Sequence, residues 1–164
     1  MRIVGDIRGS RLAAIGVALA LSLSPAVASP AGSDGWARYT DPESGISISY
    51  PQRLFPETAE TDEGLRFIGA EAEIEISARD DIGVRSTGEL RDLIMNAEGY
   101  AKLTYSPAGK SWMVASGYRN GDVYYEKFFV RGGKLRAFSI RYPKEARATY
   151  DPVVERLEDE FKPW

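Results

Sequence analysis

Residues 112–142 read WMVASGYRNGDVYYEKFFVRGGKLRAFSIRY and hold the strongest structural signal in the chain. Three runs rich in aromatic and β-branched side chains are separated by short turns, which is the pattern of a β-meander. The first turn contains Asn120-Gly121, two residues that tolerate a positive φ and therefore favour a tight hairpin. We expect antiparallel strands over residues 112–118, 123–130 and 135–142.

The middle strand of this meander carries aromatic side chains on both of its faces. Successive side chains of a strand point to opposite faces, and the aromatic residues here are Tyr124, Tyr125, Phe128 and Phe129. A sheet that is wet on one side would not place such groups on that side. We therefore expect packed cover on both faces of the sheet.

Further strands are expected upstream of the meander. Residues 36–40 and 46–50 flank a turn that contains Pro and Gly, and they should form a hairpin. Residues 65–68 and 70–78 follow, and the second run alternates strictly between apolar and polar side chains. Residues 51–63 hold two prolines and four acidic residues, so we expect a loop there.

The sequence predicts a first helix after residue 85. Ser86 and Glu89 form a capping box, in which each side chain accepts a hydrogen bond from a free backbone N–H group. Apolar residues then recur at helical spacing and share one face: Leu90, Leu93, Ile94 and Ala97. Gly99 is placed to end this helix.

A second helix is expected to begin at Asp151-Pro152, an N-cap followed by Pro at the first helical position. Val154, Leu157 and Phe161 would share one stripe of it. With a short strand at 101–105, residues 36–162 read as a single α+β domain. It would contain an antiparallel sheet of about seven or eight strands with helices packed on it.

The first 28 residues have the three parts of a removable export signal. Three arginines precede the uncharged run at residues 12–23, and Ala26-Val27-Ala28 has the small-x-small pattern of a signal peptidase site. We expect cleavage between Ala28 and Ser29, a flexible leader over 29–35, a periplasmic or secreted location, and no transmembrane segment afterwards. The alternative is an uncleaved anchor, although this run is short for a bilayer span.

Composition excludes several function classes. The chain has 164 residues with no Cys and no His, which removes thiol nucleophiles, zinc fingers, Cys-ligated clusters and imidazole bases. Removing residues 1–28 takes away three arginines and one aspartate, so the net charge changes from −3 to −5. An acidic surface is poorly suited to phosphate backbones, and we expect neither nucleic-acid binding nor a cofactor.

An acidic row lies on the strand expected over 70–78. Glu71, Glu73 and Glu75 share one of its faces. Such a row could hold a hard cation such as Ca²⁺, because these ions take oxygen ligands. The alternative, which we favour, is a solvated face opposite a basic strand, so no metal site is assigned.

Two other groups of residues are candidates for contact with a partner. Glu158, Asp159 and Glu160 crowd the C-terminal end of the last helix, where the helix dipole disfavours negative charge. They could form a contact site for a basic partner or simply a solvated helix end. Tyr118 lies beside the expected hairpin tip, and such loops often carry sites, although aromatic residues are more often core.

The segment YTDPESGISISYP, residues 39–51, followed by Leu54-Phe55 and a strand that ends at Phe67, resembles the start of PsbP-like domains. The later meander, which ends in Arg141-Tyr142-Pro143 before an amphipathic helix, is similar to the rest of that domain. The chain is also similar to exported proteins of proteobacteria. The resemblance covers residues 36–162 and implies the α/β/α sandwich shared with the Ran-binding nuclear import factor. PsbP is a non-enzymatic accessory of the oxygen-evolving complex, and none of its functional residues is carried over.

Two function classes remain. The first is an exported, non-enzymatic binding or accessory domain that contacts a protein of the cell envelope through a sheet edge, a hairpin tip or the acidic last helix. The second is a small carboxylate-dependent hydrolase of envelope polymers, because paired carboxylates can cleave glycosides without His or Cys. The enzyme would need two carboxylates that converge in a cleft, at least one with a raised pKa. We expect the binding domain.

Overall fold

A computed structural model describes residues 32, 34–97 and 103–164. Its elements follow in the order β1 (Trp36–Thr40), β2 (Ser47–Pro51), β3 (Glu57–Thr61), β4 (Gly64–Ile68), β5 (Glu73–Arg79), α1 (Thr87–Met95), β6 (Leu103–Tyr105), β7 (Trp112–Arg119), β8 (Asp122–Arg131), β9 (Lys134–Pro143), the 3₁₀ turn η2 (Lys144–Ala146) and α2 (Arg147–Glu160).

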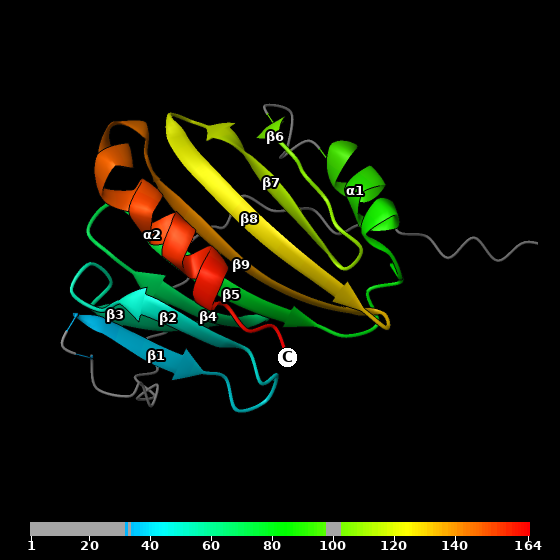
Figure 1. Ribbon diagram of the computed structural model, residues 1–164, viewed down its shortest axis with the longest axis horizontal. Coiled ribbons are helices and arrows are strands. Elements are labelled where there is room, and N and C mark those ends of the chain that lie inside the picture. The colour runs from blue at the N-terminus through cyan, green and yellow to red at the C-terminus, as the bar shows by residue number, and fades with distance from the viewer. Residues whose placement is uncertain (1–31, 33, 98–102) are drawn as a thin grey trace, which may run out of the picture.

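Seven of these strands form one antiparallel sheet in the order β3-β4-β5-β9-β8-β7-β6 (Figure 1). The expected meander is present as β7, β8 and β9. Its first turn has Asn120 at φ 54° and Gly121 at φ 93°, as a two-residue hairpin requires. The predicted α+β class with an antiparallel sheet is therefore confirmed.

The two α-helices cover opposite faces of this sheet. On β7, Val114 belongs to the core beneath α2, together with Phe138 and Leu157. Its neighbour Met113 points the other way and packs with Leu90 and Ile94 of α1. This is the α/β/α layering of the expected sandwich, with cover on both faces of β8. We call the two sides the α2 face and the α1 face.

The hairpin β1–β2 forms a separate two-stranded sheet and lies on the α2 face beside α2 (Figure 1). The Tyr50 ring packs on the Phe67 ring of β4, with 4.3 Å between their centroids. Beyond α2, the backbone returns to this hairpin. Ser47 N donates to Lys162 O at 2.9 Å, and Lys162 N donates to Ser47 O at 2.8 Å.

The prediction of a loop over residues 51–63 is wrong, because Glu57–Thr61 form strand β3 and pair with β4. Without β3, the N–H and C=O groups on the outer side of β4 would have no partner. The exposed acidic side chains that suggested a loop also suit an edge strand, where charge discourages pairing with other chains.

The second helix begins at Arg147 rather than at Asp151, and Pro152 lies inside it. The turn η2 leads directly into α2, so the helix is already formed when the chain reaches Asp151. That carboxylate binds Tyr142 and Arg147 instead of capping the helix.

The first helix begins after Ser86 as expected, and Glu89 N donates to Ser86 Oγ at 3.2 Å. Leu93, however, is 62% exposed rather than part of the buried stripe, since α1 turns Leu90 and Ile94 toward the sheet. Gly99, the start of the strand expected at 101–105, and the signal region lie outside the described residues. At the end of the expected leader, Asp34 pairs with Arg156 of α2 at 2.7 Å.

Candidate binding groove

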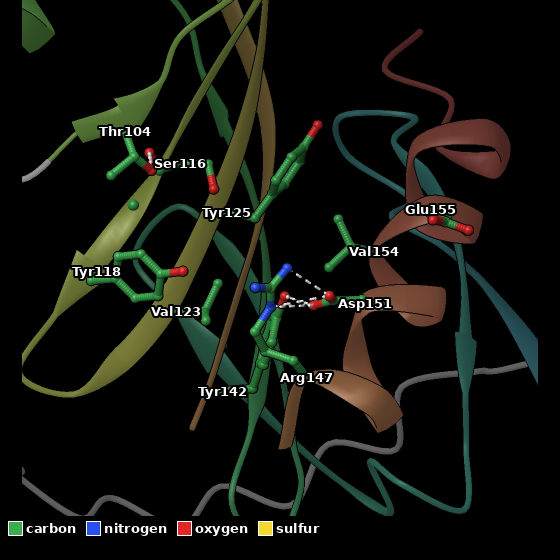
Figure 2. A pocket seen from close by; sticks show the side chains of 11 residues that line it. Thr104, Ser116, Tyr118, Val123, Tyr125, Tyr142, Arg147, Asp151, Val154 and Glu155 are labelled. Carbon is green, nitrogen blue, oxygen red and sulfur yellow. Dashed lines mark hydrogen bonds and ion pairs between the residues drawn. The ribbon is translucent and has the colours of Figure 1, made fainter. Parts of the chain in front are cut away.

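A groove of about 310 Å³ opens on the α2 face, between the first half of α2 and the strands β6 to β9 (Figure 2). The sheet contributes side chains that alternate onto this face. The helix contributes residues from its first three turns. Its lining includes the side chains of Tyr118, Val123, Tyr142, Arg147, Asp151 and Val154.

A chain of hydrogen bonds fixes the helix side of the groove. The buried Tyr142 hydroxyl donates to Asp151 Oδ1 at 2.8 Å. Arg147 Nε donates to Asp151 Oδ2 at 3.1 Å, and Arg147 Nη2 lies 2.9 Å from the same oxygen. Burial and the bond to Asp151 raise the pKa of Tyr142, so its hydroxyl remains a donor. Hydrogen bonding to Asp151 likewise raises the pKa of Arg147, which keeps its charge.

Tyr118 forms the opposite side of the groove at its open end. Its side chain is 36% exposed, and its hydroxyl points toward the Arg147 guanidinium (Figure 2). The Nζ atom of Lys144 lies 5.5 Å from the centre of the Tyr118 ring, a cation–π distance. The accessible tyrosine therefore lies next to two cationic side chains.

Next to the groove, Glu158 is turned inward to the sheet. The Tyr125 hydroxyl donates to Glu158 Oε1, and Lys127 Nζ donates to the same oxygen at 2.9 Å. The Lys127 side chain is only 15% exposed, and its Nζ atom lies 5.3 Å from the Trp112 ring. Burial raises the pKa of Tyr125 most, and the hydrogen bond to Glu158 raises it further.

The other acidic residues at the end of α2 take different positions. Glu160 Oε1 accepts from Arg156 Nε at 2.7 Å. A hydrogen bond from Ser49 and then the bond from Arg156 lower the pKa of Glu160, although burial opposes them. Asp159 is exposed to solvent. The three carboxylates thus do not converge, and of the candidate contact residues the structure brings only Tyr118 and Glu158 to the groove region. Ala28 and Ser29 lie outside the described residues.

The acidic row on β5 is paired with arginines. Glu75 accepts from Arg66 of β4 at 2.7 Å, and Glu73 accepts from Arg141 of β9 at 3.3 Å. Glu71 precedes the strand and is exposed. We expect such pairing from the interpretation of this acidic row as a solvated face opposite a basic strand. Among the described residues, no three potential metal ligands gather at one place.

The carboxylates of the groove do not have the features of a hydrolytic pair. Asp151 is already held by Arg147 and Tyr142.

Two aspects of this site could not be read from the sequence alone. The i, i+4 spacing of Arg147 and Asp151 is a signal for a helical ion pair, but only a helix that begins at Arg147 reveals it. Tyr142 and Tyr118 approach α2 only because of the sheet order. Across residues 32, 34–97 and 103–164, the helices are too short or too polar to cross a bilayer.

Comparison with solved structures finds the same fold. The solution structure of cyanobacterial PsbP (CyanoP) from Synechocystis sp. PCC 6803 aligns with a TM-score of 0.62 and 12% identity, over 83% of this chain and 96% of that chain. The chain therefore has the PsbP-like fold that the sequence resemblance implied. Likeness at this identity shows the fold alone. No family model matches the chain, and no curated protein does.

Proposed function

We propose that this PsbP-like chain is an exported, non-enzymatic binding or accessory domain, and that it contacts a protein of the cell envelope through the groove beside α2. One observation carries the proposal. An accessible aromatic ring, Tyr118, lies opposite an arginine that Asp151 and Tyr142 hold in place. Aromatic and arginine side chains are the residues that most often dominate protein interfaces.

The alternative hydrolase of envelope polymers has less support. Its chemistry requires two carboxyl groups on either side of a bound sugar, one of them protonated near neutral pH. In the groove, Asp151 and Glu155 instead follow each other by one turn on α2. Asp151 also accepts hydrogen bonds from a cation and a hydroxyl, so both of its oxygens already have partners within the chain.

Export supports an envelope partner. The positive region, the apolar run and the small residues before Ser29 form a pattern that directs a chain out of the cytoplasm. Mass spectrometry of the protein recovered from its own cells tests this step. We expect a chain that starts at Ser29 and is recovered from the envelope fraction. An intact chain that begins at Met1 in the cytoplasm would contradict export.

Site-specific cross-linking tests the groove. A photoreactive phenylalanine analogue replaces Tyr118 in the full chain, and the same analogue replaces Arg91, which is exposed on α1 over the other face. We expect an envelope protein to be cross-linked from position 118 and not from position 91. Equal cross-linking from both positions, or none from 118, would remove the groove as the contact site.

A further inference from the structure

We propose that the groove captures the C-terminal carboxylate of its partner, carried by an apolar last residue, and that Arg147 binds this carboxylate. The inference rests on the proposed function and adds the chemistry of the contact.

Arg147 has free donors on the side that faces the groove. A guanidinium has N–H groups on Nε, Nη1 and Nη2. Nε and Nη2 bind Asp151, whereas Nη1 has no hydrogen-bond partner in the described part of the chain. Figure 2 shows this guanidinium in the middle of the groove, between Asp151 and Tyr118. The edge formed by Nη1 and Nη2 can donate two parallel hydrogen bonds to a carboxylate.

Arg147 is also held ready for such a ligand. Asp151 binds it through two nitrogens, and the buried Tyr142 hydroxyl fixes the Asp151 carboxylate in turn. An arginine that is already oriented loses little conformational freedom when it binds. A fixed guanidinium edge is selective for planar anions, and carboxylates are the commonest of these in proteins.

The charges around the groove complement an anion at its open end. Lys144 lies against the Tyr118 ring, and Arg147 is the first residue of α2, whose N-terminus has no side-chain cap. The positive end of the helix dipole is therefore at the same place. Two carboxylates line the groove: Asp151 is paired with Arg147, and Figure 2 shows the Glu155 carboxylate beyond Val154, away from Arg147.

Apolar side chains lie beside this cationic end. Val123 of β8 and Val154 of α2 line the groove on either side of Arg147 (Figure 2). When Arg147 binds the carboxylate of a C-terminal residue, the apolar side chain of that residue lies next to these valines. A C-terminal residue carries both groups on one Cα atom, and the volume of about 310 Å³ suits a chain end better than a long segment.

Small probes test this assignment by NMR titration of the purified protein. The probes are N-acetyl-leucine, its amide, and N-acetyl-glutamic acid α-amide, whose only carboxylate is on the side chain. We expect N-acetyl-leucine to shift the Arg147 Nε–H signal saturably, and its amide to bind about tenfold more weakly because the bidentate pair is lost. The glutamic acid derivative keeps a carboxylate but has no apolar side chain on the carbon that bears it, so we expect it also to bind about tenfold more weakly. Equal binding of the leucine amide, or of the glutamic acid derivative, would overturn the assignment.

Matched variants locate the contact. Arg147→Gln keeps a polar side chain but loses the guanidinium edge, and we expect N-acetyl-leucine to bind about tenfold more weakly. Arg91→Gln on α1 should bind like the unmodified chain. Thermal unfolding of both variants confirms that each is folded, which is expected because the Arg147–Asp151 pair is exposed. Unchanged binding by the Arg147 variant would refute the role of this residue.

The two proposals can fail separately. If cross-linking from position 118 persists at full strength when Arg147→Gln is present, the groove binds a partner but Arg147 does not recognise it. If N-acetyl-leucine binds at Arg147 while position 118 captures no envelope protein, the carboxylate chemistry stands and the proposed envelope partner does not.

Discussion

Removal of Glu158 should destabilise the protein far more than its place at the end of an acidic helix suggests. Its carboxylate accepts hydrogen bonds from Tyr125 and from Lys127. The Lys127 side chain is 15% exposed and the Glu158 side chain 33% exposed. Glu158→Ala would therefore leave a largely buried ammonium group without its counter-ion and a buried hydroxyl without its acceptor.

The two losses set the magnitude. An unpaired buried charge costs roughly 3–5 kcal/mol, and we take about 2 because Lys127 is not fully buried. A buried hydroxyl that loses its acceptor adds about 1 kcal/mol. Glu158→Ala should then lower the free energy of unfolding by about 3 kcal/mol. Lys127→Met should cost about 1 kcal/mol, because Glu158 remains bound to Tyr125 and reaches solvent.

The double variant distinguishes this pair from two independent residues. With both groups gone no charge remains buried, and the combined cost should be about 2 kcal/mol, well below the sum of the single costs. Urea unfolding followed by tryptophan fluorescence measures each value, and Trp112 lies next to Lys127. Glu155→Ala, at an exposed residue of α2 on the edge of the groove, is the control and should cost less than about 0.5 kcal/mol. The reasoning would be refuted if Glu158→Ala lowered the free energy of unfolding as little as this control does. It would also be refuted if the cost of the double variant equalled the sum of the two single costs.

Three other predictions follow from packing and ionisation. Phe138→Ala, at a fully buried ring in the centre of the sheet, should cost about 3–5 kcal/mol in urea unfolding. Gly64→Ala should lower the free energy of unfolding by about 2 kcal/mol or more, because the new Cβ would clash with Ile76 O at 2.2 Å. Gly88→Ala meets no atom closer than 3.8 Å and should stabilise α1 by about 0.5 kcal/mol. Equal effects of the two substitutions would contradict the clash at Gly64. Burial and then Asp41 raise the pKa of Tyr39 to about 12, so the stability it contributes is present below pH of about 10 and is lost as the pH rises toward 12. Tyr39→Phe should reduce the fall in the free energy of unfolding over this pH range, measured by urea unfolding at a series of pH values. The same fall in the variant would exclude a contribution from Tyr39.

The meander was predictable because its signals are local. Asn120-Gly121 adopts the positive φ values that its residue types allow, and Ser86 caps α1 as its spacing indicates. In both cases the residues that decide the structure are within a few positions of each other. Propensity and turn chemistry act over this range.

The groove and the Lys127–Glu158 pair were not predictable because they depend on sheet order. Glu158 meets Tyr125 and Lys127 only after α2 has packed on the meander. The strand β3 was missed for a related reason, since its identity comes from pairing with β4 and not from its own acidic residues. Tertiary context overrides weak local preferences in such segments.

The backbone bonds between Ser47 and Lys162 bear on how the protein is made. The two residues are 115 positions apart, so the hairpin β1–β2 leaves the ribosome long before the segment that fastens it exists. An isolated hairpin is marginally stable, and unpaired strand edges are prone to aggregate. The backbone bonds to Lys162 can therefore form only after synthesis has passed that residue, and an earlier stop would release a protein whose first two strands lack them. The last residues of the described chain thus complete the backbone pairing of a strand made near its start.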